Sequence, residues 1–472
     1  MLFLNKSNIL EESYKKIKEY IEESNNSMAK VVEFKDPAEL KEIIDTKINK
    51  NAVTEKQFLG LIDSYLDYSV KTSSKQFLNQ LYSGLNFPAF IGEMITALTN
   101  TSMYTYEVAP VATIIETEMI NLMNQYSGYV EGDGVFVSGG SNANLVAMLS
   151  ARNKKIPKVR TEGLDRSMKL RVFINENAHY SFETAANILG IGADHVIKIK
   201  SDSKGAMIPA ELDKAIVLSL NKNEQPFFVV ATCGTTLVAA YDPIEEIYEI
   251  CKKHDIWLHA DGSFGGSILL SDKHRYLMRG IEKTDSFAWN PHKLMNIPLI
   301  CSALLVKKRG SLQKNITDIN TDYIYHDIDL IEDLGKKSIQ CGRKVDAVKL
   351  WFAWKYFGLK GYENRIENLI DMAIYAEEIV NNASRLELMS VRNSFAVCFR
   401  YVPESKTDVN QFNLAIRETM RKEGLSIVNY SYMEKQLVIR LIVANGELET
   451  KDIDLFFENI NKIGKRLEIK LI

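Results

Sequence analysis

The sequence predicts an α/β protein built on a mostly parallel, doubly wound sheet. Three observations support this fold class. From Gly134 onward, short β-rich runs alternate with helical patterns. The chain has 472 residues, enough for one large domain and a smaller appendage. Several glycines and polar residues directly follow the predicted strands, which is where ligands gather in such sheets.

The N-terminal part of the chain is predicted to be helical. Apolar residues recur at helical spacing between charges over residues 9–23, 37–48 and 55–70. These amphipathic segments have little core of their own, so we expect residues 1–76 to form a helical segment that packs on a partner subunit. A further helix is expected to end near Tyr126.

Seven runs predict the strands of the sheet, because they are short, rich in β-branched and aromatic residues, and separated by helical patterns. They are residues 135–137, 170–174, 195–199, 227–232, 256–261, 286–289 and 301–307. Gly139, Gly234, Asp261 and Lys293 each come just after one of these runs. The carboxyl ends of parallel strands meet at one edge, so these four residues are predicted to lie together. The large domain is expected to cover residues 77–357.

The C-terminal part is predicted to form a smaller α+β domain over residues 358–472, since strand and helix patterns alternate there. Before it, residues 315–337 form a polar stretch with few core signals. A loop of that length in a compact domain is usually functional or disordered.

Composition excludes several classes of protein. A formal net charge of −3 gives no bulk attraction to nucleic acid or to acidic membranes. No apolar run is long enough to cross a bilayer, and the first six residues are too short for a signal peptide. The five cysteines are scattered and lack metal-ligand spacing. We therefore expect no metal site, and we expect the reduced thiols of a cytoplasmic protein.

Two residues suggest chemistry at the predicted sheet edge. Lys293 ends the turn that begins at Asn290, and a lysine there can form a Schiff base with an aldehyde cofactor if its amine is not fully protonated. Most lysines are solvated surface charges, so this signal is weak by itself. Asp261 ends a buried strand and needs a cationic or donor partner. The pyridinium nitrogen of pyridoxal phosphate (PLP) is one such partner; capping of the next turn is the alternative.

The glycine-rich turn at Gly139 and Gly140 passes from a predicted strand into a predicted helix. Glycines let the backbone approach an anion closely, and Ser141 is expected to cap the helix, so free N–H groups and the helix dipole could meet a phosphate. An ordinary strand-to-helix turn is the alternative interpretation.

Further polar side chains could complete a cofactor site. His179 could stack on a cofactor ring, although a lone histidine is more often a packed or surface residue. Thr236 would place a hydroxyl near the ring substituents. Ser286 and His292 could add donors to a phosphate.

Together with several collinear motifs, these residues resemble the group II PLP-dependent amino-acid decarboxylases, in the branch of glutamate, aspartate and cysteine-sulfinate decarboxylases. The resemblance covers nearly the whole chain. The motifs lie at residues 79–85, 104–110, 132–134, 242–244, 288–293 and 339–346.

The resemblance implies a type I aminotransferase-like fold, PLP as the cofactor, and an obligate homodimer with active sites at the interface. Matched residue by residue, it implies that Lys293 is the Schiff-base lysine, Asp261 the pyridinium partner and His179 the ring-stacking residue. It places Tyr323 on a mobile loop that reaches the neighbouring subunit's site, where it acts as the general acid. It assigns a phosphate cradle to four residues, Gly140, Ser141, Ser286 and His292.

The chain departs from the family after the strand that ends at Asp261. The family usually has Asp-Ala-Ala, whereas this chain has Gly262 and Ser263 after the aspartate. Ser263 would therefore place a hydroxyl where an alanine methyl normally packs beneath the cofactor ring. Phe264 replaces a tryptophan.

The resemblance also implies a substrate pocket. Gln80, Tyr82, Ser102 and Tyr104 match positions that line it, and Arg440 matches an arginine that binds the substrate α-carboxylate. Glutamate enzymes typically have a serine at the position of Tyr82, so the tyrosine ring should shorten the pocket. This favours aspartate, cysteine sulfinate or cysteate over glutamate as the small acidic amino acid that is decarboxylated.

Other functions stay open from the sequence. The substrate could be glutamate, phosphoserine or an aromatic amino acid. An oxidative, aldehyde-forming relative generally has phenylalanine at the loop position, so Tyr323 favours simple decarboxylation. A catalytically silent scaffold subunit is the alternative from another class, and retention of Lys293, Asp261, His179 and Tyr323 argues against it.

Overall fold

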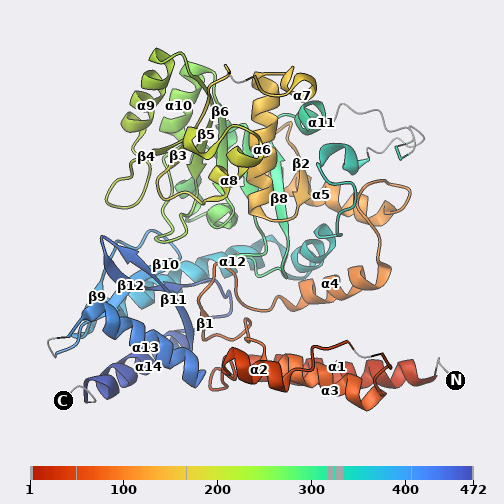
Figure 1. Ribbon diagram of the computed structural model, residues 1–472, viewed down its shortest axis with the longest axis vertical. Helices are drawn as coiled ribbons and strands as arrows, with labels where there is room; N and C mark the ends of the chain where they lie inside the picture. The colour runs from red at the N-terminus through yellow and green to blue at the C-terminus, as the bar shows by residue number, and fades with distance from the viewer. Residues whose placement is uncertain are drawn as a thin grey trace. The chain divides into compact units, whose positions relative to one another are not determined.

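A computed structural model describes residues 4–48, 50–165, 167–316, 324–325, 333–404 and 407–469 of the chain. It divides into two compact units (Figure 1). Unit 1 comprises Met1–Gly84, Asp371–Ser390 and Val397–Ile472, and unit 2 comprises Leu85–Ile370 and Val391–Ala396. None of the helices in the described ranges is both long and apolar enough to span a membrane.

Unit 2 is built on a seven-stranded sheet in the order β2-β8-β7-β6-β5-β3-β4. Strands β7, β6, β5, β3 and β4 are parallel neighbours, whereas β8 runs antiparallel to both β7 and β2. The strands are β2 (Asp133–Val137), β3 (Leu170–Asn175), β4 (Val196–Ile199), β5 (Gln225–Thr232), β6 (Trp257–Gly262), β7 (Ser286–Trp289) and β8 (Ser302–Val306). The predicted mostly parallel sheet is confirmed, and each of the seven predicted runs is a strand.

The connections between these strands are mainly helical, as a doubly wound sheet requires. The helices of unit 2 before the last segment are α4 (Phe87–Thr99), α5 (Pro110–Ser127), α6 (Gly140–Lys155), α7 (Val159–Glu162), α8 (Ser181–Ile188), α9 (Pro209–Asn221), α10 (Ile244–His254) and α11 (Ser311–Ile316). Helix α12 (Ala347–Asn382) follows, with a kink at Gly358, whose φ of 67° is not helical. The kink divides α12 into two helical segments, and its residues from Asp371 onward belong to unit 1.

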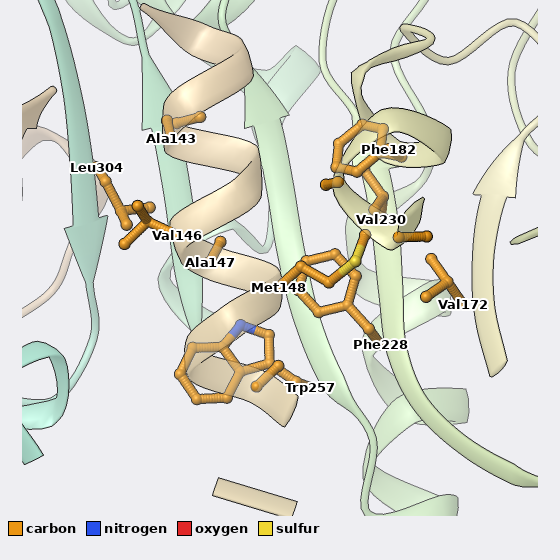
Figure 2. Close-up of a cluster of buried hydrophobic side chains, with 14 of the residues drawn as sticks. Ala143, Val146, Ala147, Met148, Val172, Phe182, Phe228, Val230, Trp257 and Leu304 are labelled. Atoms are coloured by element: carbon orange, nitrogen blue, oxygen red, sulfur yellow. The ribbon is translucent and has the colours of Figure 1, made fainter. Parts of the chain in front are cut away.

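Helix α6 packs directly on the sheet, and this packing determines where its first turn lies relative to the strands (Figure 2). Ala143 and Ala147 are four residues apart and therefore share one face of the helix. Both are fully buried in a cluster with Phe228 of β5 and Leu304 of β8. The small alanine side chains allow the helix to approach the strands closely, so its first turn is held beside the carboxyl ends of β6 and β7.

Unit 1 contains a five-stranded sheet in the order β1-β11-β12-β10-β9. Phe77 of β1 pairs in parallel with Ile427 of β11. The strands are β1 (Phe77–Leu78), β9 (Leu386–Leu388), β10 (Ala396–Tyr401), β11 (Ile427–Met433) and β12 (Gln436–Ile442); the helices are α1 (Leu4–Ser24), α2 (Pro37–Ile43), α3 (Glu55–Tyr68), α13 (Val409–Glu423) and α14 (Thr450–Ile469).

The N-terminal segment lies in the same unit as the C-terminal elements, whereas the sequence predicted three separate domains with boundaries at 76/77 and 357/358. The pairing of β1 with β11 is one reason. Two hydrogen bonds are another: Ser27 Oγ donates to Asp452 Oδ1 at 2.7 Å, and Gln76 Nε2 donates to the Asp452 carbonyl at 2.8 Å. These contacts join residues several hundred positions apart, which local sequence patterns do not reveal.

Candidate active site

Lys293 follows β7 in a tight turn of unit 2. Its backbone N–H donates to the carbonyl of Asn290 at 3.0 Å, and its own carbonyl accepts from Asn296 N–H at 3.2 Å. Burial lowers the pKa of the Lys293 ammonium to about 8, against the opposing effect of the Asp261 charge. A useful fraction of this amine is therefore neutral and nucleophilic near neutral pH.

Asp261 ends β6 and is buried. Its Oδ1 accepts the Ser263 N–H at 3.0 Å, and its Oδ2 accepts from Asn144 Nδ2 at 3.0 Å. Burial acts to raise the pKa of Asp261, but the interactions with Ser263 and the nearby basic groups, among them Lys293, outweigh it, so the pKa lies below its usual value. The carboxylate is therefore ionised, and it retains lone pairs for a further donor.

His179 lies in the loop between β3 and α8. The Ser181 N–H donates to its Nδ1 at 3.2 Å, and its ring centroid is 4.3 Å from that of Tyr180. Burial lowers the pKa of His179, and the charge of Lys293 lowers it further while that of Asp261 raises it. The ring is thus neutral at neutral pH, the state in which it can stack on another aromatic ring without a charge to desolvate.

The glycine turn brings α6 against the segments that follow β6 and β7. Gly139 is the N-cap, with φ 108°, a conformation that side chains rarely adopt. The expectation that Ser141 caps the helix is therefore wrong: Ser141 is the second residue of α6 and is exposed. A Cβ atom on Gly140 would lie 2.5 Å from Ser263 Oγ and 2.8 Å from Asn290 Nδ2, so only glycine fits. The first N–H groups of α6 have no intrahelical partner and suit an anion.

Ser263 carries a buried hydroxyl without a hydrogen-bond partner in this structure. An unsatisfied buried polar group is costly unless a ligand satisfies it. Thr236, in contrast, is exposed in the turn after β5, whereas its neighbour Thr235 is buried and its Oγ1 accepts the Ala240 N–H at 3.0 Å. Ser263 is therefore the more enclosed of the two predicted hydroxyls.

His292 is buried beside Lys293, and its Nδ1 lies 2.7 Å from the carbonyl oxygen of Cys301. The Cys301 N–H also points at Nδ1, at 3.2 Å, so the carbonyl and the N–H of Cys301 favour opposite tautomers of the ring. Burial lowers the pKa of His292 to about 3, so the ring is neutral at neutral pH. The expected donation from His292 to a phosphate stays a prediction. Asn290, which bonds Ser302 through its Oδ1, lies nearer the glycine turn.

Ser286 lies at the amino end of β7, at the opposite end of that strand from the turn of Lys293. Its Oγ accepts from Trp257 Nε1 at 2.8 Å and lies 2.8 Å from His259 Nδ1. The hydroxyl is therefore engaged inside the core and is not grouped with the expected phosphate cradle.

Three of the expected substrate residues lie in unit 1. Arg440, on β12, is buried and donates from Nη2 to the carbonyl of Asn79 at 3.1 Å. Gln80 and Tyr82 follow in the same segment, and the Tyr82 ring lies 6.1 Å from that of Phe77. The structure therefore brings Arg440 close to the segment that carries Gln80 and Tyr82.

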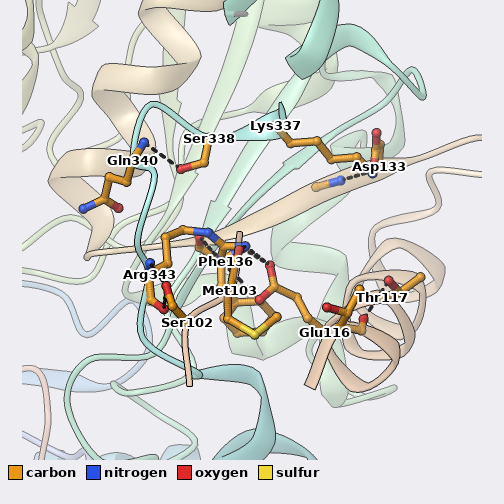
Figure 3. A network of polar contacts seen from close by, with 12 residues as sticks. Ser102, Met103, Glu116, Thr117, Asp133, Phe136, Lys337, Ser338, Gln340 and Arg343 are labelled. Atoms are coloured by element: carbon orange, nitrogen blue, oxygen red, sulfur yellow. Dashed lines mark hydrogen bonds and ion pairs between the residues drawn. The ribbon is translucent and has the colours of Figure 1, made fainter. Parts of the chain in front are cut away.

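Ser102 and Tyr104 belong to unit 2 and contact the segment 335–343. Figure 3 shows Ser102 beside Arg343. Ser102 Oγ accepts the Arg343 N–H at 3.2 Å, and the Tyr104 carbonyl accepts the Gly335 N–H at 3.0 Å. The Arg343 side chain forms a buried ion pair with Glu116 at 3.0 Å and donates to the Phe136 carbonyl at 2.9 Å. This network fixes the backbone that holds Ser102.

A second buried ion pair anchors the same region. Lys337 Nζ lies 2.7 Å from Asp133 Oδ1 at the start of β2, and both side chains are nearly inaccessible (Figure 3). The predicted loop that precedes Lys337 includes Tyr323, which lies outside the described residues. Its expected role as the general acid therefore stays a prediction.

The residues around Lys293 fit PLP. Lys293 provides an amine that is partly neutral at neutral pH, Asp261 an ionised buried carboxylate, and His179 a neutral imidazole. The start of α6 can bind an anion, and Ser263 has a buried hydroxyl without a hydrogen-bond partner. The turn at Gly140 has no room for a Cβ atom. These groups match the aldehyde, the pyridine nitrogen, the ring face and the phosphate of that cofactor.

A family model described as the pyridoxal-dependent decarboxylase conserved domain matches residues 37–402. The chain belongs to the pyridoxal-dependent decarboxylase family. The predicted enzyme class, PLP-dependent amino-acid decarboxylase, and the predicted cofactor are confirmed by this match.

Individual decarboxylases resemble this one along nearly its full length. Human cysteine sulfinic acid decarboxylase is 36% identical over 465 residues, covering 96% of this chain and 94% of the relative. Human acidic amino acid decarboxylase GADL1 is 36% identical over 450 residues, covering 92% and 86%. The crystal structure of mouse CSAD superposes with a TM-score of 0.93 at 35% identity, covering 98% of this chain and 99% of that chain. The type I fold is thereby confirmed.

Sequence reasoning missed three polar residues of this decarboxylase. Asn144 contacts Asp261, His259 contacts Asn144, and Asn290 lies against the glycine turn. The sequence spacing of two of these residues from predicted site residues could have indicated them. Asn144 lies four residues after Gly140 on the same helix face, and His259 lies two residues before Asp261 on the same strand face.

Proposed function

We propose that this decarboxylase removes the α-carboxylate of a small acidic L-amino acid, with aspartate, cysteine sulfinate or cysteate preferred over glutamate. The observation that carries this proposal is the likeness to cysteine sulfinic acid and acidic amino acid decarboxylases over more than nine-tenths of the chain. Arg440 supports it, because a buried guanidinium is suited to a carboxylate.

The roles of the site residues are part of the same proposal. Lys293 supplies the amine that attaches the cofactor and later releases the product. Asp261 holds the proton of the ring nitrogen, and His179 covers the ring face. Bound PLP supplies the electron sink for the electron pair left at Cα when CO2 departs. Tyr323 returns a proton to Cα as the general acid.

The phosphate site of the proposal lies at the glycine turn. Gly140 and Ser141 present the free N–H groups of α6, and Asn290 and Ser263 face the same turn. Four residues are proposed to select the substrate side chain: Gln80, Tyr82, Ser102 and Tyr104. A tyrosine in place of serine reduces the volume available to the longer glutamate side chain.

We also propose that the enzyme is a homodimer. Helices α4 and α5 carry apolar side chains that the chain itself leaves uncovered, including Leu98, which is 85% exposed, and Val111, which is 70% exposed. Large exposed apolar groups mark protein interfaces. Leu98→Glu and Val111→Glu should produce monomers in sedimentation analysis; dimers that persist in both variants would place the interface elsewhere.

A cytoplasmic location is supported by the cysteines. All five are free thiols, of which four are buried and Cys341 is exposed. A protein with unpaired thiols, one of them on the surface, suits a reducing compartment.

The test is a substrate panel. Purified enzyme is incubated with aspartate, cysteine sulfinate, cysteate, glutamate, phosphoserine and aromatic amino acids, and the amine products are quantified by mass spectrometry. Lys293→Ala is the control and should be inactive. The largest kcat/KM is expected for aspartate or a sulfur acid. An aromatic amine as the main product, or an aldehyde formed with hydrogen peroxide, would refute the proposal.

A further inference from the structure

A line of buried polar side chains runs along β6 toward Asp261. Trp257, His259 and Asp261 alternate on this strand, so their side chains point to the same face of the sheet. Ser286 of the adjacent strand β7 is paired with His259, and Asn144 of α6 lies over the same face. All five side chains are more than nine-tenths buried.

Hydrogen bonds link these side chains without a gap. Trp257 Nε1 bonds Ser286 Oγ at 2.8 Å, and Ser286 Oγ lies 2.8 Å from His259 Nδ1. His259 Nε2 lies 3.1 Å from Asn144 Oδ1, and Asn144 Nδ2 bonds Asp261 Oδ2 at 3.0 Å. We call this set, from Trp257 to Asn144, the β6 relay.

The Trp257 end of the relay does not by itself fix the direction of donation. An indole N–H can only donate, so Ser286 Oγ accepts from Trp257. A serine hydroxyl has one proton and a second lone pair, so from this end Ser286 can either donate to His259 Nδ1 or accept from it.

The Asp261 end of the relay fixes the direction. An ionised carboxylate can only accept, so Asn144 must turn its NH2 group toward Asp261 and its Oδ1 toward His259. That orientation requires a proton on His259 Nε2. Burial lowers the pKa of His259 to about 4, so the ring is neutral at neutral pH, and Nδ1 then accepts from Ser286.

We propose that the β6 relay positions Asp261: through its fixed direction, it holds the amide N–H2 of Asn144 toward Asp261 and so keeps this carboxylate ionised and aimed at the cofactor ring nitrogen. Without His259, the amide of Asn144 would be held only by its bonds to Asp261 and to Ser181 Oγ, which lies 3.0 Å from Nδ2. A hydroxyl can donate as well as accept, so Ser181 would also tolerate the turned amide, in which the Asn144 oxygen would face and repel the carboxylate. His259 and Asn144 are positioning residues, since they act through Asp261. The proposal rests on the role assigned to Asp261 above.

The test compares two ligands of the cofactor-free enzyme. One is PLP, and the other is its analogue in which a C–H replaces the pyridine nitrogen. Asp261 can favour only the first, so the ratio of the two dissociation constants measures the contact with the ring nitrogen. A purely structural defect would weaken both ligands equally and leave this ratio unchanged.

The variants form matched pairs. His259→Phe keeps a ring of similar size but removes both hydrogen bonds, whereas His259→Gln can accept from Ser286 and donate to Asn144 in the original direction. Asn144→Leu removes the donor to Asp261. Phe228→Leu alters the packing on the His259 ring, which lies 5.6 Å from the Phe228 ring, without touching the relay.

We expect the preference for PLP to fall at least ten-fold in His259→Phe and in Asn144→Leu, to be largely restored in His259→Gln, and to be unchanged in Phe228→Leu. A wild-type preference that persists in both His259→Phe and Asn144→Leu would overturn the relay. If one of these variants does not fold, the other decides. A wild-type enzyme that binds both ligands equally would instead overturn the role of Asp261.

A second measurement needs no cofactor. In the 15N NMR spectrum of histidine-labelled protein, the His259 signals are identified by their loss in His259→Gln. They should show a neutral ring protonated at Nε2 at neutral pH. Protonation at Nδ1, or a charged ring, would contradict the fixed direction of the relay.

Discussion

Gly140 and Ser263 approach each other so closely that a Cβ atom on Gly140 would lie 2.5 Å from Oγ of Ser263. On the other side, the same atom would lie 2.8 Å from Asn290 Nδ2. The start of α6 and the segments after β6 and β7 therefore meet without room for a methyl group. Any added volume must move the backbone N–H groups that are proposed to hold the phosphate.

Gly140→Ala should therefore weaken PLP binding while the protein still folds. Overpacking of this kind costs about 1–3 kcal/mol, which is roughly a ten-fold or larger loss of affinity if the strain falls on the binding site. The measurement is PLP titration of the cofactor-free enzyme. Combining it with Ser263→Ala, which removes the nearest atom, should recover part of the loss. Unchanged affinity in Gly140→Ala would show that the close approach is unimportant for binding.

The low pKa of Lys293 predicts the pH dependence of its reactivity. Burial lowers this pKa to about 8, so the neutral amine increases as the pH rises and reaches its plateau above that value. Modification of Lys293 by an amine-reactive reagent in the cofactor-free enzyme, followed by peptide mass spectrometry, should show a midpoint near 8. Surface lysines should titrate near their usual value of about 10.4. Asp261→Asn removes a charge that raises the pKa, so its midpoint should be lower still; a higher midpoint would contradict the contact.

Arg343→Met should strongly destabilise the protein. It leaves Glu116 as a buried carboxylate without its cationic partner, and breaking a buried ion pair in this way costs about 3–5 kcal/mol. Thermal or urea unfolding of the cofactor-free enzyme measures the loss. Arg275→Met is the matched control, because its pair with Asp272 is exposed and such pairs contribute about 0–1 kcal/mol. Equal stability of the two variants would mean that the buried network is dispensable.

Tyr82→Ser, alone or with Ser102→Asn, should shift the substrate preference toward glutamate. One methylene is worth about 1–3 kcal/mol of discrimination, or roughly ten- to two-hundred-fold in kcat/KM. The ratio of kcat/KM for aspartate and glutamate is measured in wild type and variants. Tyr82→Phe keeps the ring and should leave the ratio unchanged. A wild type that already prefers glutamate would invalidate the steric explanation.

Tyr323→Phe should bind PLP and substrate but release amine more slowly, because the proposed proton donor to Cα is lost. More carbonyl by-product is expected, and both products are measured in one assay. Amine formation at the wild-type rate would exclude Tyr323 as the general acid.

The sequence was sufficient for the large sheet because its strands are locally encoded. Each β-rich run lies between turn signals and helices, and Asp261 and Lys293 follow such runs directly. Strand β1 was missed because it has two residues and pairs with β11 some 350 positions later, for which no local pattern exists. Helix α4 was missed because its mostly apolar sequence lacks the alternation with polar residues that marks a surface helix.

Site residues could be predicted from the sequence only where a chemically suitable side chain lies at the end of a predicted strand or directly after it. Asn144 and His259 were overlooked because their hydrogen bond joins residues 115 positions apart. Ser286 was expected near a phosphate because the family resemblance assigned it to the phosphate cradle. The strand between them separates the two residues, and the Ser286 hydroxyl faces Trp257 and His259 instead.

The unequal burial of the thiols makes Cys341 a natural attachment point for a probe. Cys233, Cys251, Cys301 and Cys398 are buried, and burial raises the pKa of each, so their thiolates are scarce at neutral pH. A maleimide dye should therefore label the folded chain once, at Cys341. That dye would sit two residues from Arg343, where its fluorescence can follow the release of this segment from Glu116 in real time.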